Sequence, residues 1–414
     1  MINTYKIQIS GRVQGVGFRP YIYNLAKREN LMGFVTNNEE GVLIYINTDS
    51  TKAHSFFEKI KQHKPKVSII IKSNIEKVNF KKFANFIIKP TTTTLPVQIP
   101  LTPDFAVCNN CKKEVLDTNN RRYNYAFTTC IECGPRYAIT VKYPFERKNT
   151  SLSEFDMCKE CVKEYTDPEN LRFHSQTNSC KNCGITLEIT NNKGTILEIE
   201  QKEIVFEIVK YIKEGKIVGI KNSNGYILCC DAKNSKAINT LRKRKKRQNK
   251  PFAVMYPSIQ EIKQDFEISL KEETSLKSNI APIVILQNSD TISIKASDIA
   301  PKLNQTGVML ASTTLLFLIM QELKTPIIAT SGNCHGSPIV ATKIDALEEL
   351  KTIADYFLHH NLNIKFPQDD SIIKFEKDKE LILRRSRGFA PSYLEQEIKC
   401  NDTIIAMGAH LIPF

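Results

Sequence analysis

The sequence predicts a multidomain protein of the α+β class, with three folded parts in a row. Three observations predict it. Strand and helix patterns alternate over residues 1–90, eight cysteines in four Cys-x-x-Cys pairs mark residues 101–193, and strands and helices alternate again over residues 194–395. The chain has 414 residues, a length that suits roughly two to four domains. Residues 91–100, with four threonines and two prolines, are expected to be a linker.

Composition narrows the class of protein. Apolar residues make up 41% and charged residues 25%, as in folded proteins that need no membrane. No apolar run approaches the roughly 18 residues of a membrane helix, and the N-terminus has no charged head before an apolar block. We therefore expect a cytoplasmic protein with no membrane partner. The net charge of +14 leaves two readings open, a polyanionic partner or a generally lysine-rich composition.

Residues 1–90 have the pattern β-α-β-β-α-β. Tyr5, Ile7 and Ile9 alternate as a half-buried strand should. A helix is expected from about Pro20 to Asn30, with proline near its first turn. The remaining expected elements are strands Met32–Thr36 and Val42–Ile46, helix Lys52–Gln62, and strands Val67–Ser73 and Phe83–Lys89.

A glycine-rich loop, residues 11–17, lies between the first strand and the first helix. Its backbone N–H groups can turn inward at a helix N-terminus and form a cradle for an anion. Arg19 can add a bidentate guanidinium to the same phosphate, and the amide of Asn37 can hold an attacking water. Such a site can act on an acyl phosphate without a protein nucleophile. The predicted phosphate-binding residues are Gly15, Val16, Gly17 and Phe18.

The cysteine pairs have the spacing of zinc ligands. Each half of the segment reads Cys-x2-Cys-x18-Cys-x2-Cys, and in a cytosolic chain such pairs favour metal over disulfides. Two closed four-cysteine tetrahedra would be structural, because no position stays open for a catalytic water. An interleaved pairing is the alternative, and His174 is expected to be packed rather than a ligand. The predicted ligand sets are Cys108, Cys111, Cys130 and Cys133, then Cys158, Cys161, Cys180 and Cys183.

The third part has the alternation of an α/β domain. Lys245, Arg247 and Lys250 put three cations within six residues beside a strand, which suits a triphosphate. Ser331 and Asn333, where a strand meets a loop, can hydrogen-bond phosphate and acyl oxygens. A solvated helix face or a nucleic-acid patch is the alternative for the basic run. Expected strands are Ile217–Lys221, Phe252–Tyr256, Ile283–Leu286 and Ile327–Ala329; expected helices are Ile204–Glu214, Ser235–Lys245, Ser258–Phe266 and Thr342–Ala354.

The N-terminal part resembles the acylphosphatase family. Both family signatures are present, Gly-x-Val-Gln-Gly-Val-x-Phe-Arg at 11–19 and Gly-Phe-Val-x-Asn-x-x-x-Gly at 33–41. The resemblance implies a ferredoxin-like fold in which Arg19 binds phosphate and Asn37 orients the water.

The chain as a whole resembles the hydrogenase maturation carbamoyltransferases of the HypF family. Their zinc-finger motifs appear at 133–137, 144–151 and 172–178, and residues 194–395 resemble their YrdC-like domain. The resemblance implies two structural zinc ions, the substrates carbamoyl phosphate and ATP with Mg²⁺, and a HypE-like acceptor protein. Residues 396–414 resemble the opening strand of the family's C-terminal domain and are expected to be a stub of it. The implied nucleotide-binding residues are Lys221, Lys245, Arg247, Lys250, Ser331, Asn333, Arg385 and Arg387.

The chain departs from the family at several positions in the third part. Lys246 and Gln248 replace a glycine and a proline of the basic loop, Pro367 replaces an arginine, and five further positions also lose a histidine or an arginine. Ile227, Leu316 and Phe317 stand where the family has histidines, and Leu362 and Phe366 stand where it has arginines. We therefore expect weak adenylation, and two other functions stay open. One is a truncated or degenerate homologue that keeps only acylphosphatase activity. The other is a YrdC-like RNA-binding or tRNA-modification protein, which the Arg19 and Asn37 pair makes the less expected one.

Overall fold

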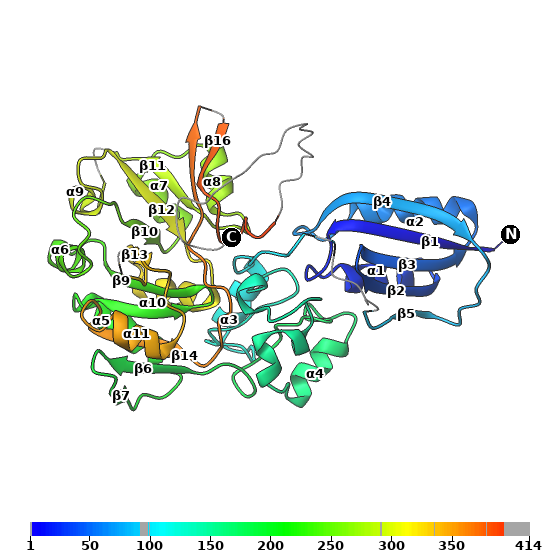
Figure 1. Ribbon diagram of the computed structural model, residues 1–414, viewed down its shortest axis with the longest axis horizontal. Helices are drawn as coiled ribbons and strands as arrows, with labels where there is room; N and C mark the ends of the chain where they lie inside the picture. The colour runs from blue at the N-terminus through cyan, green and yellow to red at the C-terminus, as the bar shows by residue number, and fades with distance from the viewer. Residues whose placement is uncertain are drawn as a thin grey trace.

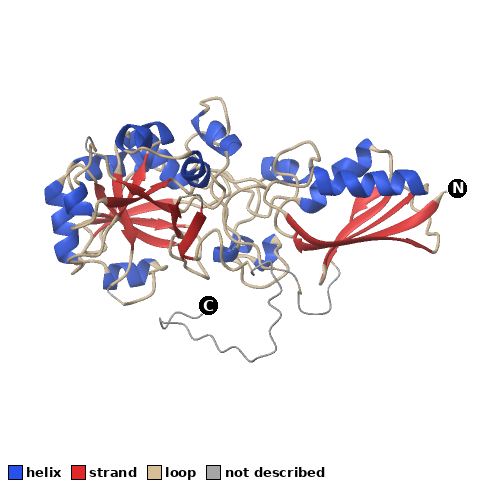
Figure 2. Ribbon diagram, turned by 90° about the horizontal axis from the view of Figure 1, so that it is seen from above, coloured by secondary structure: helices blue, strands red, loops and turns tan. Residues whose placement is uncertain are grey.

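The computed structural model describes residues 2–91, 98, 100–289, 292–334, 336–377 and 379–392. Most of the predicted linker and all of the predicted stub lie outside these residues. Three parts follow one another along the long axis, an N-terminal domain, a loop-rich cysteine module around α3 and α4, and an α/β domain (Figure 1). Seen from above, the two β-sheets lie at opposite ends, with the module between them (Figure 2).

The N-terminal domain has the predicted β-α-β-β-α-β order, followed by a short fifth strand. Two helices pack on one face of a five-stranded sheet with the order β4-β1-β3-β2-β5. Tyr5, Ile7 and Ile9 of β1 are buried as their alternation predicts, and the Asp49 side chain caps α2 by accepting from the Lys52 N–H. The elements are β1 (Asn3–Arg12), α1 (Phe18–Arg28), β2 (Met32–Asn38), β3 (Gly41–Thr48), α2 (Ser50–Gln62), β4 (Ile69–Val78) and β5 (Phe86–Ile88).

The cysteine module has little regular structure, as its sequence predicts. Its two α-helices each begin directly after the first cysteine of one half, Cys108 and Cys158. The elements are α3 (Asn109–Leu116), α4 (Lys159–Thr166) and three short 3-10 helices, η1 (Tyr137–Ile139), η2 (Arg147–Asn149) and η3 (Ser151–Glu154).

The α/β domain is built on a mixed sheet of eleven strands, in the order β16-β15-β11-β12-β10-β13-β9-β8-β14-β6-β7. All the strands and helices expected from sequence are present, although α11 is shorter than predicted. The strands are β6 (Leu187–Asn191), β7 (Ile196–Leu197), β8 (Val218–Asn222), β9 (Gly225–Asp231), β10 (Ala253–Tyr256), β11 (Ile283–Gln287), β12 (Gln305–Leu310), β13 (Ile327–Ser331), β14 (Tyr356–His360), β15 (Ile372–Glu376) and β16 (Lys379–Arg384). The helices are α5 (Ile204–Lys213), α6 (Ser235–Arg244), α7 (Ile259–Asp265), α8 (Leu270–Leu276), α9 (Ala296–Ile299), α10 (Thr314–Leu323) and α11 (Lys343–Glu349).

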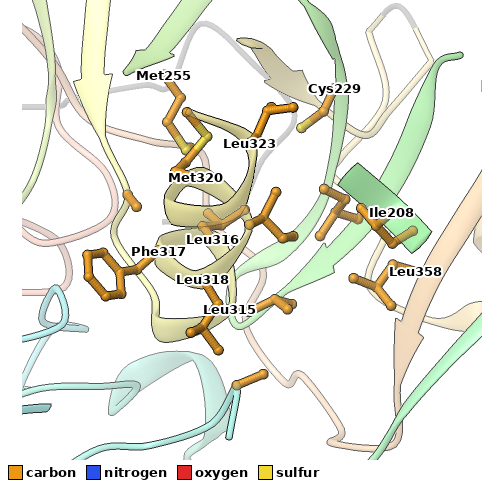
Figure 3. Close-up of a cluster of buried hydrophobic side chains, with 14 of the residues drawn as sticks. Ile208, Cys229, Met255, Leu315, Leu316, Phe317, Leu318, Met320, Leu323 and Leu358 are labelled. Carbon is orange, nitrogen blue, oxygen red and sulfur yellow. The ribbon is translucent and has the colours of Figure 1, made fainter. Parts of the chain in front are cut away.

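Helix α10 is the centre of the largest hydrophobic core. It is apolar on nearly every side, as a fully buried helix must be, and the Thr313 side chain caps it by accepting from the Leu316 N–H. Figure 3 shows its side chains packed among residues of α5, β9, β10 and β14. Val107, Cys111 and Val115 of the cysteine module belong to the same core. The module is therefore held by apolar packing against α10 as well as by its cysteines.

Across the described ranges, no helix combines the length and the apolar character that crossing a membrane requires.

Candidate active sites and metal centres

The glycine loop before α1 presents free backbone donors. Gly15 and Gly17 have φ of 71° and 75°, a conformation that glycine adopts without strain, and α1 has no side-chain cap. Within the part of the chain that the structure describes, no group accepts a hydrogen bond from the N–H groups of residues 15–19. A run of unpaired N–H groups at a helix N-terminus is suited to bind a phosphate.

Arg19 and Asn37 lie beside this loop. Arg19 Nη1 is 3.3 Å from Thr91 Oγ1 and 3.8 Å from Glu146 Oε1, so the guanidinium is held by groups outside its own helix. Burial lowers the pKa of Arg19 and Glu146 opposes that shift. Asn37, near the end of β2, is 3% exposed, and its Oδ1 has no hydrogen-bond partner among the described residues. A buried acceptor of this kind normally binds a water or a ligand.

The cysteine module closes this site from the outside. A cavity of about 30 Å³ lies between the two parts. Ile131 of the module packs so closely on Gly17 that a Cβ there would be 2.9 Å from Ile131 Cδ1. Arg136 of the module donates its Nε–H to the Gly15 carbonyl at 2.7 Å. From the N-terminal domain the lining residues are Val13, Gln14, Gly15, Gly17, Phe18, Arg19, Pro20 and Asn37; from the module they are Ile131, Arg136, Phe145, His174, Ser175 and Gln176.

The contribution of the cysteine module to this cavity was not predicted from the sequence. His174 was expected to be packed near the second metal set, and its ring does pack against Tyr165 and Phe173, at 5.0 and 4.7 Å between centroids. It also lines the cavity. Burial, helped by the charge of Arg19, lowers the pKa of His174 to about 4.

The eight cysteines form two separate clusters, with the predicted membership and not the interleaved one. In each cluster three of the six Sγ–Sγ distances are 3.6 to 3.8 Å, and all four sulfurs lie within 4.8 Å of one another. Four sulfurs at about 2.3 Å from a tetrahedral Zn²⁺ would lie about 3.8 Å apart, so the geometry fits zinc. Arg121 Nη2 lies 3.1 Å from Cys180 Sγ and can offset the negative charge that four thiolates leave on the site. Four sulfur ligands would fill the coordination shell of a zinc ion in each cluster, as they do in structural zinc sites.

The α/β domain holds a larger cavity of about 320 Å³, between β9, β10, β13 and the basic loop after α6. Lys245 Nζ lies in it and donates to the carbonyls of Ser331 and Asn333 at 2.7 and 2.6 Å. Burial, followed by the nearby Arg247, lowers the pKa of Lys245 to about 8, and burial lowers that of Arg247 to about 10. Burial also lowers the pKa of Lys250. Burial makes the charged form of all three side chains less stable, and a bound polyanion would restore that stability. The cavity therefore suits a polyanion.

Known proteins match each part of the chain. The acylphosphatase family matches residues 5–88, the family described as HypF finger matches 107–140 and 157–190, and the family described as Telomere recombination, of Sua5, YciO and YrdC, matches 210–386. The carbamoyltransferase HypF of Synechocystis sp. is 42% identical over 410 residues, and a probable carbamoyltransferase HypF of Methanocaldococcus jannaschii is 41% identical over 408. The chain belongs to the HypF family.

The match covers the N-terminal region of HypF. It takes in 99% and 98% of this chain but 53% of each relative, so the chain spans about half the length of the curated relatives it matches. A crystal structure of full-length HypF, described as its phosphate- and nucleotide-bound form, has a TM-score of 0.89 at 39% identity and covers 95% of this chain and 51% of that one. A HypF structure from T. kodakarensis has a TM-score of 0.85 at 34% identity and covers 94% of this chain and 50% of that one.

The structure brings together five of the eight nucleotide-binding residues that the HypF resemblance implied. Lys245, Arg247, Lys250, Ser331 and Asn333 line the large cavity. Ser331 Oγ donates to Asn333 Oδ1 at 2.8 Å, so these two side chains bond to each other at the junction between β13 and the following loop.

The other three residues lie elsewhere. Arg387 is buried and bonded to Asp370 Oδ1 at 2.7 Å and to the carbonyl of Ile280 at 2.9 Å, and Arg385 donates to the Ser392 carbonyl. Lys221 lines a second cavity. Arg384, at the end of β16, lines the large cavity in their place, 3.4 Å from Asp369. The three arginines stand within one short motif, of which Arg384 ends β16 and the other two lie in the loop that follows.

The positions that depart from HypF do not share one environment. Ile227 lines the large cavity, opposite Ser331 in the pairing of β9 with β13. Leu316 and Phe317 lie on α10 in the hydrophobic core and not in that cavity. Of the last two, Leu362 lines the second cavity, and Phe366 stacks on Tyr137 at 4.6 Å. Only one of the five substitutions therefore touches the predicted nucleotide site.

The basic run from Arg242 to Arg247 is not a uniform solvated face. Arg242 donates to the carbonyls of Asp298 and Arg247, Arg244 pairs with Asp355 at 2.8 Å, and Lys245 points into the cavity. Arg247 also donates to the carbonyls of Lys250 and Pro251, so four of the six residues of the run make contacts inside the domain, which weakens the case for a nucleic-acid patch.

Proposed function

We propose that this chain performs the first two reactions of a HypF carbamoyltransferase. Water attacks the phosphorus of carbamoyl phosphate at the Arg19 site, the P–O bond to the carbamoyl group breaks, and carbamate leaves with the electron pair. A carbamate oxygen then attacks the α-phosphorus of ATP in the Lys245 cavity, which releases pyrophosphate and leaves carbamoyl adenylate. Transfer of the carbamoyl group to a HypE-like acceptor would need the C-terminal half of HypF, which this chain does not match.

One observation carries the first reaction, the unpaired amide oxygen of Asn37 beside the free loop N–H groups and Arg19. The loop and the guanidinium can hold the phosphate and stabilise charge that develops on its oxygens. Asn37 Oδ1 can accept a hydrogen bond from the attacking water and so orient it. No protein nucleophile is needed.

The second reaction rests on the cations of the large cavity. The ammonium of Lys245 and the guanidiniums of Arg247 and Arg384 can bind the triphosphate, and Mg²⁺ would arrive with the nucleotide. The second cavity, lined by the cysteine module and by Lys221, supports a sheltered passage for carbamate, which decomposes in water. The pKa of Lys221 is lowered by burial to about 8, so its amine is still largely charged at pH 7 and can attract this anion.

The test is hydrolysis of carbamoyl phosphate by the full chain. Arg19→Ala should lose most of both binding and turnover, and Asn37→Ala should lower kcat more than it raises KM, because it frees only the water. Arg28→Ala, an exposed arginine at the end of the same helix, is the matched control and should keep the wild-type rate. A wild-type rate no higher than that of Arg19→Ala would refute the proposal.

A further inference from the structure

The two fingers of the module match the same family, so each residue of the first finger has a counterpart in the second. Their matched ranges, 107–140 and 157–190, are offset by fifty residues. Asn124 and its counterpart His174 both have φ of 55°, and each donates its N–H to the equivalent carbonyl, that of Val115 or Tyr165. The backbone of the two copies therefore coincides at this turn.

The side chains that follow the turn differ. In the first finger Tyr125 places its hydroxyl 3.1 Å from Ser179 Oγ and accepts from the Ile185 N–H at 2.9 Å. The second finger has Ser175 at this position, which is 2% exposed and whose Oγ has no hydrogen-bond partner among the described residues. One copy thus fills the position with a fully bonded tyrosine, and the other leaves a small, unpaired hydroxyl.

The difference between Tyr125 and Ser175 lies beside the acyl-phosphate site. Ser175 lines the cavity that also holds Arg19 and Asn37. Its neighbour Gln176 is already occupied, since its Nε2 donates to Tyr165 Oη and the His174 carbonyl and its Oε1 accepts from the Arg147 N–H. Ser175 is thus part of the wall of this space, and its hydroxyl is buried and unpaired, which costs free energy unless a ligand pairs with it.

We propose that Ser175 of the second finger is a substrate-binding residue of the acyl-phosphate site, whose hydroxyl hydrogen-bonds the carbamoyl NH₂ group. This inference rests on the proposed acyl-phosphate hydrolysis and names the acyl group that the site selects. The loop and Arg19 hold the phosphate end, and the finger supplies the opposite wall, so the acyl end points at Ser175. The small cavity further restricts the site to small acyl groups.

The pair of substrates that tests this is carbamoyl phosphate and acetyl phosphate. They differ by an NH₂ against a CH₃ of similar size, and only the first can donate to Ser175 Oγ. A site that bonds a polar substrate group discriminates against the analogue that lacks it, because the site's own polar atom is then left unpaired. Ser175→Ala should lower kcat/KM for carbamoyl phosphate by about tenfold. It should change kcat/KM for acetyl phosphate by less than about twofold.

Two further measurements separate binding from folding. Ser153→Ala, the same change at an exposed position of the module, should leave both rates at the wild-type value. Ser175→Ala should keep its zinc content and lose no thermal stability, since the Ser175 hydroxyl bonds to no group among the residues that the structure describes. A loss of Tm or of zinc would show a structural serine and overturn the proposal.

The ratio of kcat/KM for carbamoyl phosphate to kcat/KM for acetyl phosphate separates the role of Ser175 from the proposed function. If Arg19→Ala abolishes hydrolysis while Ser175→Ala leaves the carbamoyl-to-acetyl ratio unchanged, the role of Ser175 is overturned and the proposed function stands. If the wild-type chain hydrolyses neither compound, the proposed function fails and this inference fails with it.

Discussion

Arg122 of the first finger reaches across the module to Glu164 of the second, with its Nη2 2.6 Å from Glu164 Oε2. The pairing is reciprocal, because fifty residues on Arg172 of the second finger pairs with Glu114 of the first. The two arginines also donate their Nε to equivalent carbonyls, Arg122 to that of Ser179 and Arg172 to that of Thr129. Each finger therefore supplies the arginine that holds the other, next to both cysteine clusters.

Arg122→Ala should destabilise the module strongly. The Arg122 side chain is 2% exposed, and its removal leaves the Glu164 carboxylate with Arg121, at 2.9 Å, as its remaining ion-pair partner. Breaking a buried pair on one side costs about 3–5 kcal/mol, and Arg121 should keep the loss near the lower end. We expect a lower Tm and loss of zinc from the second cluster first. Lys210→Ala, which breaks an exposed pair with Glu207, is the comparison and should cost less than about 1 kcal/mol. Equal Tm values for the two variants would contradict this view of the module.

Removal of zinc should unfold the module and loosen the α/β domain, but spare the N-terminal domain. Cys111, Cys130 and Cys133 lie in the core around α10, so loss of their metal exposes apolar surface of that helix. The N-terminal domain has a core of its own around Ile7 and Ile44. Metal analysis of fresh protein should give two zinc ions per chain. After chelation, hydrogen exchange should rise in α3, α4 and α10 and stay slow in β1 and β3. Slow exchange throughout α3 and α4 would mean that apolar packing suffices.

What could be predicted from the sequence was what short-range patterns specify. Cysteine spacing identified both metal centres, and the loop motif identified the Arg19 site, because each depends on residues close together in the chain. The contribution of Ser175 and Ile131 to that site could not be predicted, since it depends on how the module packs against another domain. Arg384 was passed over for Arg385 and Arg387 because the motif does not reveal that β16 ends at Arg384 beside the cavity, while the two other arginines lie in the loop beyond it.

Nucleotide binding should weaken as pH rises from 7 to 9. The pKa of Lys245 is lowered to about 8 by burial, so its amine is charged below that pH and neutral above it. A neutral amine no longer attracts the triphosphate, and affinity for ATP should fall across this interval. The affinity of Lys245→Arg should be lower at pH 7 but nearly independent of pH, because a guanidinium stays charged throughout. Titration calorimetry at four pH values measures both, and parallel curves for the two proteins would exclude Lys245 as the titrating group.

Pyrophosphate exchange driven by carbamoyl phosphate should be weak, and Ile227→His should strengthen it. Ile227 is the one substituted position that lines the large cavity, opposite Ser331, where a histidine could donate to a phosphate oxygen. One such donor is worth about 100-fold or more in turnover in other enzymes, so even a poorly placed imidazole should gain about tenfold.

Leu316→His supplies the contrast, because it restores a family histidine at a site that is 1% exposed on α10. It should add no exchange and should lower the Tm, since it removes a packed leucine and buries a polar ring in the core. The assay uses labelled pyrophosphate beside a full-length HypF. Exchange in the wild-type chain as fast as in that control would show that Arg384 and the lysines compensate for the lost histidine. In that case Ile227 contributes apolar shape to the cavity, and the cations alone are sufficient for adenylation.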